Sequence, residues 1–311
     1  MRLFVVSPRG FCAGVRRAID IVDLALEKFP SPVYVRREIV HNKLVVEDFK
    51  KRGVIFIDEV SEAPAGSTVV FSAHGISPEV RNLSKDRNLK TIDATCPLVT
   101  KVHLEVHRFL KEGYSLVLIG HKDHDEVIGT MGEAPGQIQL VEKAHDVDNL
   151  KILNPNMVMI LTQTTLSVDE TKGLMAAIRS RFPNAKTPPK DDICYATQNR
   201  QDAVRELLNL KINLLLVVGS KNSSNSQRLV DVAKEGGVPG YLIDQASEIN
   251  PEWLSGVQNI GLTAGASAPE YLVQEVVSFL KKDFNVESED VFIKEENVVF
   301  SLPKELVTPA P

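Results

Sequence analysis

Several features that mark common classes of protein are scarce or missing in this chain of 311 residues. It has only 3 cysteines, an odd number with no CxxC pair, which excludes a disulfide framework and a zinc ribbon. Its longest apolar runs, such as Leu214–Val218, are far shorter than the ~18 residues of a membrane-spanning helix. The apolar run after Arg2 ends before Arg9, too short for the ~7 to 15 apolar residues of a signal sequence. We therefore expect a cytoplasmic protein in a reducing compartment, with no membrane segment.

Charge of one sign is also missing, since 36 Lys and Arg face 41 Asp and Glu and the net charge is −5. Such a chain has no field that attracts a polyanion, so we expect no nucleic-acid partner. Neither the P-loop lysine motif nor GxGxxG occurs, which disfavours nucleotide hydrolysis and dinucleotide binding. With 43% apolar and 25% charged residues, the composition is typical of a globular protein, and the length predicts two or three compact units.

What the chain does contain is an alternation of short β-branched runs with segments of helical period. This pattern predicts an α/β protein with mainly parallel sheets, whose ligands bind in loops at the carboxyl ends of the strands. The expected strands are Leu3–Val6, Val54–Ile57, Val69–Ser72, Leu116–Ile119, Val158–Leu161, Leu214–Val218 and Ile260–Thr263. The expected helices are Ala18–Lys28, Val99–Lys111, Asp169–Arg181, Gln198–Leu208, Arg228–Glu235 and Glu270–Lys281.

Cys12, Cys96 and Cys194 lie about one in each third of the chain, and each precedes a helical pattern. A free cysteine is often just a small buried hydrophobe. The partial positive charge of a helix N-terminus, however, lowers a thiol's pKa and favours the thiolate that binds metal. Three ligands so far apart suit an iron-sulfur cube better than zinc, and they leave one iron open to a substrate.

Histidines and hydroxyl-rich loops indicate an anionic ligand. His41, His74 and His124 have turn-like surroundings, and Ser223–Ser226 and Thr263–Ser267 each follow a strand and open a helix. Either loop can simply cap its helix, but helix N-termini also bind phosphate. Together these features suggest a small phosphorylated ligand. His103 and His107 we assign to a helix surface with no role.

The motifs taken together resemble one family, the 4-hydroxy-3-methylbut-2-enyl diphosphate reductases, which catalyse the last step of the non-mevalonate isoprenoid pathway. The resemblance runs from about residue 3 to 281 and resumes near Asn297–Leu306. The matching stretches are Pro8–Val15, Ile39–Asn42, Phe71–Gly75, Asp93–Pro97, Gly129–Gly132, Thr162–Ser167, Asp192–Thr197, Gly219–Asn225 and Thr263–Glu270.

The resemblance implies three α/β lobes in a trefoil around a central [4Fe-4S] cluster held by Cys12, Cys96 and Cys194. We expect lobes at 1–96, 97–193 and 194–281, then a tail, 282–311, in which Glu287–Asp290 is solvated and Asn297–Leu302 forms one possible strand.

By the same resemblance the enzyme removes the hydroxyl of its allylic diphosphate substrate with two electrons and two protons, giving isopentenyl or dimethylallyl diphosphate. Thr164 would orient the hydroxyl, which would occupy the open iron, and Glu126 would supply the proton. A ferredoxin or flavodoxin would supply the electrons. The residues implied to bind the diphosphate are His41, His74, His124, Ser223, Ser224, Asn225 and Ser267.

One departure from the family pattern is Asp125, which stands where proline usually separates the histidine and glutamate of the acid loop. A second carboxylate there raises the pKa of Glu126 if it points inward and has no effect if it faces water. Two rival functions stay open: a zinc or non-haem iron hydrolase that uses His121, His124 and Glu126, and a non-enzymatic iron-sulfur sensor.

Overall fold

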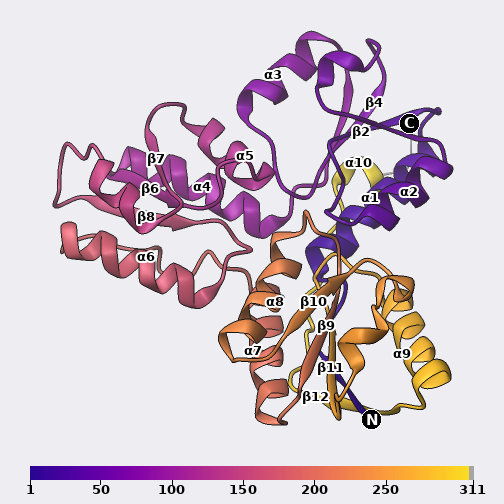
Figure 1. The fold of residues 1–311 in the computed structure, drawn as a ribbon. Helices are drawn as coiled ribbons and strands as arrows, with labels where there is room; N and C mark the ends of the chain where they lie inside the picture. Colours follow the sequence, from indigo (N-terminus) through magenta and orange to yellow (C-terminus); the bar gives the residue numbers. More distant parts are fainter. Residues whose placement is uncertain (308–311) are drawn as a thin grey trace. The chain divides into compact units, whose positions relative to one another are not determined.

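The computed structural model describes residues 1–307 (Figure 1). They divide into two compact units: unit 1 consists of residues 1–15, 41–48 and 195–299, and unit 2 consists of residues 16–40, 49–194 and 300–307. Within residues 1–307 every strand pairing is parallel, which confirms the predicted α/β class.

Unit 1 is built on one five-stranded sheet in the order β10-β9-β11-β1-β12. Its strands are β1 (Arg2–Ser7), β9 (Leu214–Val218), β10 (Gly240–Ile243), β11 (Asn259–Ala264) and β12 (Glu287–Phe292). Its helices are α7 (Tyr195–Asn209), α8 (Ser224–Glu235) and α9 (Glu270–Phe284). Because β1 lies between β11 and β12, the start of the chain is bound into a sheet made otherwise from its last third.

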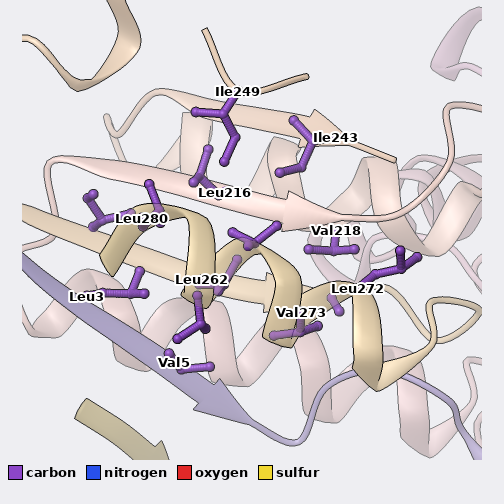
Figure 2. Packing of buried hydrophobic residues seen from close by; sticks show 14 of the residues in the cluster. Leu3, Val5, Leu216, Val218, Ile243, Ile249, Leu262, Leu272, Val273 and Leu280 are labelled. Atoms are coloured by element: carbon purple, nitrogen blue, oxygen red, sulfur yellow. The ribbon is translucent and has the colours of Figure 1, made fainter. Parts of the chain in front are cut away.

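Both faces of this sheet are buried, because successive side chains of a strand point to opposite faces. Leu214, Leu216 and Val218 of β9 pack in a cluster with α9, whereas Leu215 and Val217 pack with α7 and α8. Figure 2 shows the first cluster, in which leucine and valine side chains of β1, β9 and β11 lie against α9. Since each such buried side chain contributes ~1.5 to 3 kcal/mol, the loops at the strand ends are held on a firmly packed base.

Unit 2 contains two further sheets, in the orders β3-β2-β4-β5 and β7-β6-β8. Their strands are β2 (Val33–Arg36), β3 (Val54–Ile57), β4 (Thr68–Phe71), β5 (Lys90–Asp93), β6 (Ser115–Ile119), β7 (Ile138–Val141) and β8 (Val158–Thr162). The remaining helices are α1 (Ala13–Lys28), α2 (Lys43–Lys51), α3 (Pro78–Asp86), α4 (Pro97–Lys111), α5 (Asp125–Glu133), α6 (Val168–Arg181) and α10 (Lys304–Val307). Short 3₁₀ turns occupy Val60–Glu62, Ala144–Asn149, Ala246–Glu248 and Pro251–Leu254.

The three sheets share one topology. Each sheet contains three strands that are consecutive in the chain, and the earliest of the three lies between the other two: β9 between β10 and β11, β2 between β3 and β4, and β6 between β7 and β8. In two sheets a further strand lies beside the last of the three, namely β1 beside β11 and β5 beside β4, and in the third sheet an isolated parallel bridge from Met159 to Lys186 takes this place. Strand order thus reverses at the same point in every lobe, where open α/β sheets bind ligands.

The seven strands predicted within residues 1–281 and all six predicted helices are present. Five of the helices begin one to five residues earlier than expected, and α9 begins at Glu270 as predicted. The predicted strand at Asn297–Leu302 is wrong, since the strand of the tail is β12. Most side chains of β12 are exposed, as expected for Glu287–Asp290, but its backbone pairs with β1, and ladder hydrogen bonds at a sheet edge need no apolar side chains. No helix within residues 1–307 is both long and apolar enough to cross a membrane.

Candidate functional site

The three cysteines have the same local setting in three different lobes. Each immediately precedes a helix, namely α1, α4 and α7, as the sequence predicts. Each also donates its backbone N–H to a carbonyl in the loop that follows a strand, namely β11, β4 and β8 for Cys12, Cys96 and Cys194. Cys12 donates to Ala266 at 3.1 Å, Cys96 to Ala73 at 2.9 Å and Cys194 to Thr164 at 3.0 Å.

These contacts fix each cysteine at the carboxyl edge of a parallel sheet. None of the three forms a disulfide within residues 1–307, and all three are half-buried. A thiol at a helix N-terminus is readily held as thiolate, and thiolates are the ligands that soft iron and iron-sulfur clusters prefer. The donor chemistry and partial burial of the three side chains therefore fit an iron-sulfur group.

In unit 1, hydroxyl side chains gather after β9 and β11. Ser223 is the N-cap of α8 and accepts a hydrogen bond from the Ser226 backbone N–H at 3.3 Å. Ser267, in the loop after β11, lies 3.4 Å from the Ser223 hydroxyl and donates to the His41 carbonyl at 2.8 Å. The loop that carries His41 is held again where the Lys43 N–H donates to Ser220 at 3.0 Å. The polar residues that the sequence singled out here are thus brought together.

Asn225 fixes the loop that holds Cys12. Its side-chain oxygen accepts from the Ala266 N–H at 2.8 Å, and its amide nitrogen donates to the Thr197 hydroxyl at 3.3 Å. Asn225 is buried, and Ala266 is the residue whose carbonyl binds Cys12. A Cβ on the neighbouring Gly265 would lie 1.9 Å from the Ser226 hydroxyl, so only glycine allows this close approach.

In unit 2, Glu126 is a buried carboxyl group on the first turn of α5. It is only 3% exposed, and its Oε1 accepts a hydrogen bond from the Thr164 backbone N–H at 2.8 Å. The pKa of Glu126 is raised to about 7, chiefly by burial and also by the negative charge of Asp192, while the hydrogen bonds from Thr164 oppose the shift. A carboxyl group with this pKa can give up a proton near neutral pH.

Thr164 connects this carboxyl group to a cysteine. Its N–H binds Glu126, while its carbonyl accepts the N–H of Cys194. Asp192, two residues before Cys194, is held by the Thr162 N–H at 3.0 Å and by the Lys101 ammonium group at 2.7 Å. The end of β8 therefore positions an acid and a thiol together.

The acid loop also contains His124 and Asp125. His124 is the N-cap of α5, and its Nδ1 accepts from the Glu126 N–H at 3.2 Å. Its ring meets the His74 ring edge to face, with centroids 5.9 Å apart. Asp125 points neither to water nor to Glu126: it forms an ion pair with Arg37, and its other oxygen lies 3.9 Å from Nδ1 of His74. The charge of Asp125 is not among the causes that shift the pKa of Glu126.

Two other histidine interpretations can now be judged. Within residues 1–307, His121, His124 and Glu126 do not form a group whose ligand atoms lie close enough to share a metal ion, which disfavours the hydrolase. The surface assignment of His103 is wrong, because this side chain is buried and its Nδ1 lies 2.8 Å from Glu133. His107 is exposed as expected and contacts the other oxygen of Glu133 at 2.7 Å.

Sequence reasoning gave no role to Arg37 and Asp192, although both contact or influence the acid loop. Asp192 lies in a motif that the sequence did single out, and an acid next to a cysteine motif was a usable signal. Arg37 had no such signal, because its partner is 88 positions away.

Comparison with known proteins places these features in context. A family model described as LytB protein matches residues 3–281. A 4-hydroxy-3-methylbut-2-enyl diphosphate reductase of Aeromonas hydrophila is 55% identical over 309 residues, covering 98% of this chain and 99% of that protein. A protein of the same name from Azoarcus sp. is 54% identical, covering 98% and 97%.

Solved structures agree. The structure of the E-1-hydroxy-2-methyl-but-2-enyl-4-diphosphate reductase from Plasmodium falciparum matches with a TM-score of 0.95 and 41% identity, covering 98% of this chain and 96% of that one. A structure described as (E)-4-hydroxy-3-methyl-but-2-enyl diphosphate reductase, the terminal enzyme of the non-mevalonate pathway, matches with a TM-score of 0.65 and 35% identity, covering 91% and 100%.

Proposed function

The chain belongs to the LytB protein family. We propose that it reduces 4-hydroxy-3-methylbut-2-enyl diphosphate to isopentenyl and dimethylallyl diphosphate. The observation that carries the proposal is the path Glu126–Thr164–Cys194, in which one residue binds both a buried acid and a cysteine at a helix start. A reductive loss of hydroxyl needs such a pair, because a proton must reach the leaving oxygen close to the source of electrons.

The polar loops supply the binding of the diphosphate. We infer that it is held by side chains from the acid loop, from the loops after β2 and β4, and from the loops after β9 and β11. The helix N-termini of α5 and α8 contribute partial positive charge and backbone N–H groups. The side chains assigned to this role are His41, His74, His124, Ser223, Ser224, Asn225 and Ser267. Because Asn225 also fixes the loop of Cys12, its role is partly structural.

Cys12, Cys96 and Cys194 are the residues that would hold a [4Fe-4S] cluster, as their chemistry and helix-start positions support. When bound with one iron free of a protein ligand, such a cluster supplies electrons and a Lewis-acidic position for the hydroxyl of the substrate.

The protein's own groups then move the proton. Glu126, with a pKa of about 7, is protonated in a large share of molecules at neutral pH, about half of them at pH 7, and donates its proton to the leaving oxygen. Thr164 keeps the carboxyl group in place through its backbone N–H. The C–O bond breaks, the hydroxyl leaves as water, and two electrons and a second proton complete the product. Which carbon receives that proton decides between the two isomers.

The electrons must come from a partner, for which we propose a small one-electron carrier such as a ferredoxin or flavodoxin. Reduced carriers of this kind and three free cysteines both belong to a reducing compartment, which supports a cytoplasmic location.

Anaerobic purification followed by an assay with a reduced dye tests the proposed function. We expect a brown protein with about four irons per chain that oxidises the dye when the allylic hydroxy-diphosphate is added. The matched control substrate is the same alcohol without its diphosphate, which should react poorly because the anion contacts are lost.

The rival functions give different results in the same experiment. A hydrolase of the acid loop would contain zinc or a single iron and would act on its substrate without reductant. An iron-sulfur sensor would contain the cluster and show no turnover. Either result would overturn the proposed function.

A further inference from the structure

The ion pair between Arg37 and Asp125 is not accounted for by the reaction described above. Asp125 places an anionic side chain between His124, a proposed diphosphate ligand, and Glu126, the proposed proton donor. It is well buried, with 13% of its side chain exposed, and its Oδ2 lies 3.9 Å from Nδ1 of His74. An uncompensated carboxylate in this place would repel a diphosphate bound by the same two histidines.

Arg37 is positioned to remove that repulsion. It follows β2, and its backbone adopts a φ of 56°, a left-handed conformation that is unusual for a residue with a side chain. The conformation is held by the Arg37 N–H, which donates to the carbonyl of Ile57 at 2.7 Å. From this anchored backbone the guanidinium group reaches the first residue of α5 and binds Asp125 Oδ1, with 26% of the arginine side chain exposed.

The contact therefore joins two lobes of unit 2 at their strand-end loops. Arg37 and His74 come from the loops after β2 and β4, on either side of the point where strand order reverses, and Asp125 comes from the lobe of β6. Oδ1 of Asp125 is engaged by Arg37, which leaves Oδ2 facing His74. In this arrangement the Nδ1 side of the His74 ring faces a carboxylate, which restricts the orientation of the ring.

We propose that Arg37 is a positioning residue for diphosphate binding: it neutralises Asp125 and holds it against His74, so that this carboxylate orients the histidine instead of repelling the substrate. The inference rests on the proposed function, since it concerns the same diphosphate-binding site. It predicts a particular sign of coupling. Removing Arg37 alone is harmful because it releases the charge of Asp125, and removing both partners is much less harmful.

The test is a double-mutant cycle on the cluster-loaded enzyme with Arg37→Ala, Asp125→Pro and the variant carrying both. Proline is suitable because it is readily accommodated at the first position of a helix, which Asp125 occupies. Two quantities are measured: KM and kcat for the allylic diphosphate, and the affinity for inorganic pyrophosphate by calorimetry. Arg52→Ala serves as the control, because it removes another ion-paired arginine of unit 2, the partner of Asp23.

We expect Arg37→Ala to raise KM and to weaken pyrophosphate binding about tenfold, the scale of one charge-assisted contact, with kcat changed little. The variant carrying both changes should recover to within about twofold of the parent, and Arg37→Lys should recover part of the loss. Arg52→Ala should bind pyrophosphate like the parent.

Two outcomes would overturn the inference: normal pyrophosphate affinity in Arg37→Ala, or no recovery when Asp125→Pro is added, which would mean that Arg37 merely supports its loop. These outcomes are separable from failure of the proposed function. If the parent does not reduce the substrate, the proposed function fails, while its pyrophosphate affinity still decides the role of Arg37. If the parent binds no pyrophosphate, the inference fails whether or not the substrate is reduced.

Discussion

At the scale of single residues, Glu126 combines near-complete burial with one strong backbone hydrogen bond. A buried carboxyl group that accepts a single N–H is stabilised less as an anion than it would be in water, so it keeps its proton to higher pH. Asp192, which forms an ion pair with Lys101, contributes to this rise in the pKa of Glu126 through its negative charge.

Replacing Glu126 by glutamine tests its role. Glutamine keeps the size and can still accept from the Thr164 N–H, so folding and substrate binding should persist. It cannot release a proton, and we expect turnover to fall by ~10² to 10⁴-fold, the usual contribution of general acid catalysis. Anaerobic dye assays measure the rate, and Arg52→Ala, which removes an ion pair with Asp23, is the control. Turnover near that of the parent in Glu126→Gln would remove Glu126 from the mechanism.

The raised pKa of Glu126 also predicts how stability depends on pH. Its pKa is about 7 in the folded state against 4.5 for an ordinary glutamate, so the folded protein binds the extra proton between these values. The free energy of unfolding should therefore fall as pH rises from about 4.5 to 7, by at most about 1.4 kcal/mol per pH unit for this group. Glu105, whose pKa burial also raises to about 7, acts in the same direction.

Urea unfolding at several pH values checks this prediction. Glu126→Gln should flatten the decline, and Glu105→Gln should remove a further part of it. If both variants lose stability with pH as steeply as the parent does, the protonated state of these buried acids is not what the slope reports.

Local motifs identified the candidate site residues but not their contacts. Cys12, His124 and Glu126 lie in recognisable sequence motifs. Their positions relative to the predicted strands and helices were enough to predict that each lies in a loop or at a helix start. The ion pair of Arg37 with Asp125 depends on two lobes meeting, and no local pattern encodes it. The burial of His103 was missed for a related reason, since its helix face is covered by α5 through Glu133.

At the scale of elements, the helices that follow the cysteines are the repeated functional device. α1, α4 and α7 each begin directly after a cysteine, whose N–H is tied to a neighbouring strand-end loop. The helix start favours the thiolate, and the tie to the loop fixes its position. The same device accounts for cysteine at a position where serine or aspartate would cap a helix better.

Replacing any one of the three cysteines by serine separates these roles. Serine is a good N-cap, so the helix and the fold should survive. Its hydroxyl stays protonated and is a poor ligand for soft iron, so iron and sulfide content should drop sharply in each variant. Both are assayed anaerobically beside the urea midpoint of the metal-free protein.

Ser77→Ala is the matched control for the cysteine variants, since Ser77 caps α3 by accepting from the Val80 N–H. This substitution should cost about 1 kcal/mol of stability and leave the iron content unchanged. A full cluster in any cysteine-to-serine variant would show that cysteine to be a structural hydrophobe.

The central strands were predictable because they are buried on both faces and therefore almost wholly apolar, as in Leu214–Val218. Of the five strands that sequence reasoning missed, four have only four residues each, and four lie at sheet edges. β7 and β10 have half-buried residues in their middle, and β12 is acidic and exposed. Such strands are held by main-chain hydrogen bonds to the neighbouring strand, and these bonds require no particular pattern of apolar side chains.

At the scale of the whole molecule, the three sheets repeat one strand order although no sequence repeat is visible. In the sheet of unit 1, the strand beside β11 is β1, from the opposite end of the chain. The pairing of Leu3 with Ile260 therefore joins positions far apart in sequence. A sequence pattern predicts that a strand exists and on which face it is buried. It does not say which distant strand is its neighbour.

The C-terminal segment is bound to unit 1 by a buried charge. Arg200 of α7 is completely buried, donates to the Gly10 carbonyl at 2.8 Å and pairs with Glu296 at 3.0 Å. Glu296→Ala would leave a guanidinium group buried without its counter-ion, and we expect the protein to lose about 3 to 5 kcal/mol of stability. Urea midpoints measure the loss. Glu295→Ala, a change at the exposed neighbour, should have almost no effect; equal midpoints for the two variants would contradict the assignment.

We propose above all that this protein couples electron transfer to loss of a hydroxyl from an allylic diphosphate. The most direct measurement is the ratio of reduced one-electron dye consumed to isoprenoid diphosphate formed, determined anaerobically on the cluster-loaded enzyme. The account predicts two dye molecules oxidised for each molecule of isopentenyl or dimethylallyl diphosphate, with both quantities falling together in Glu126→Gln. Product formed without dye oxidation, or dye oxidised without either product, would contradict it.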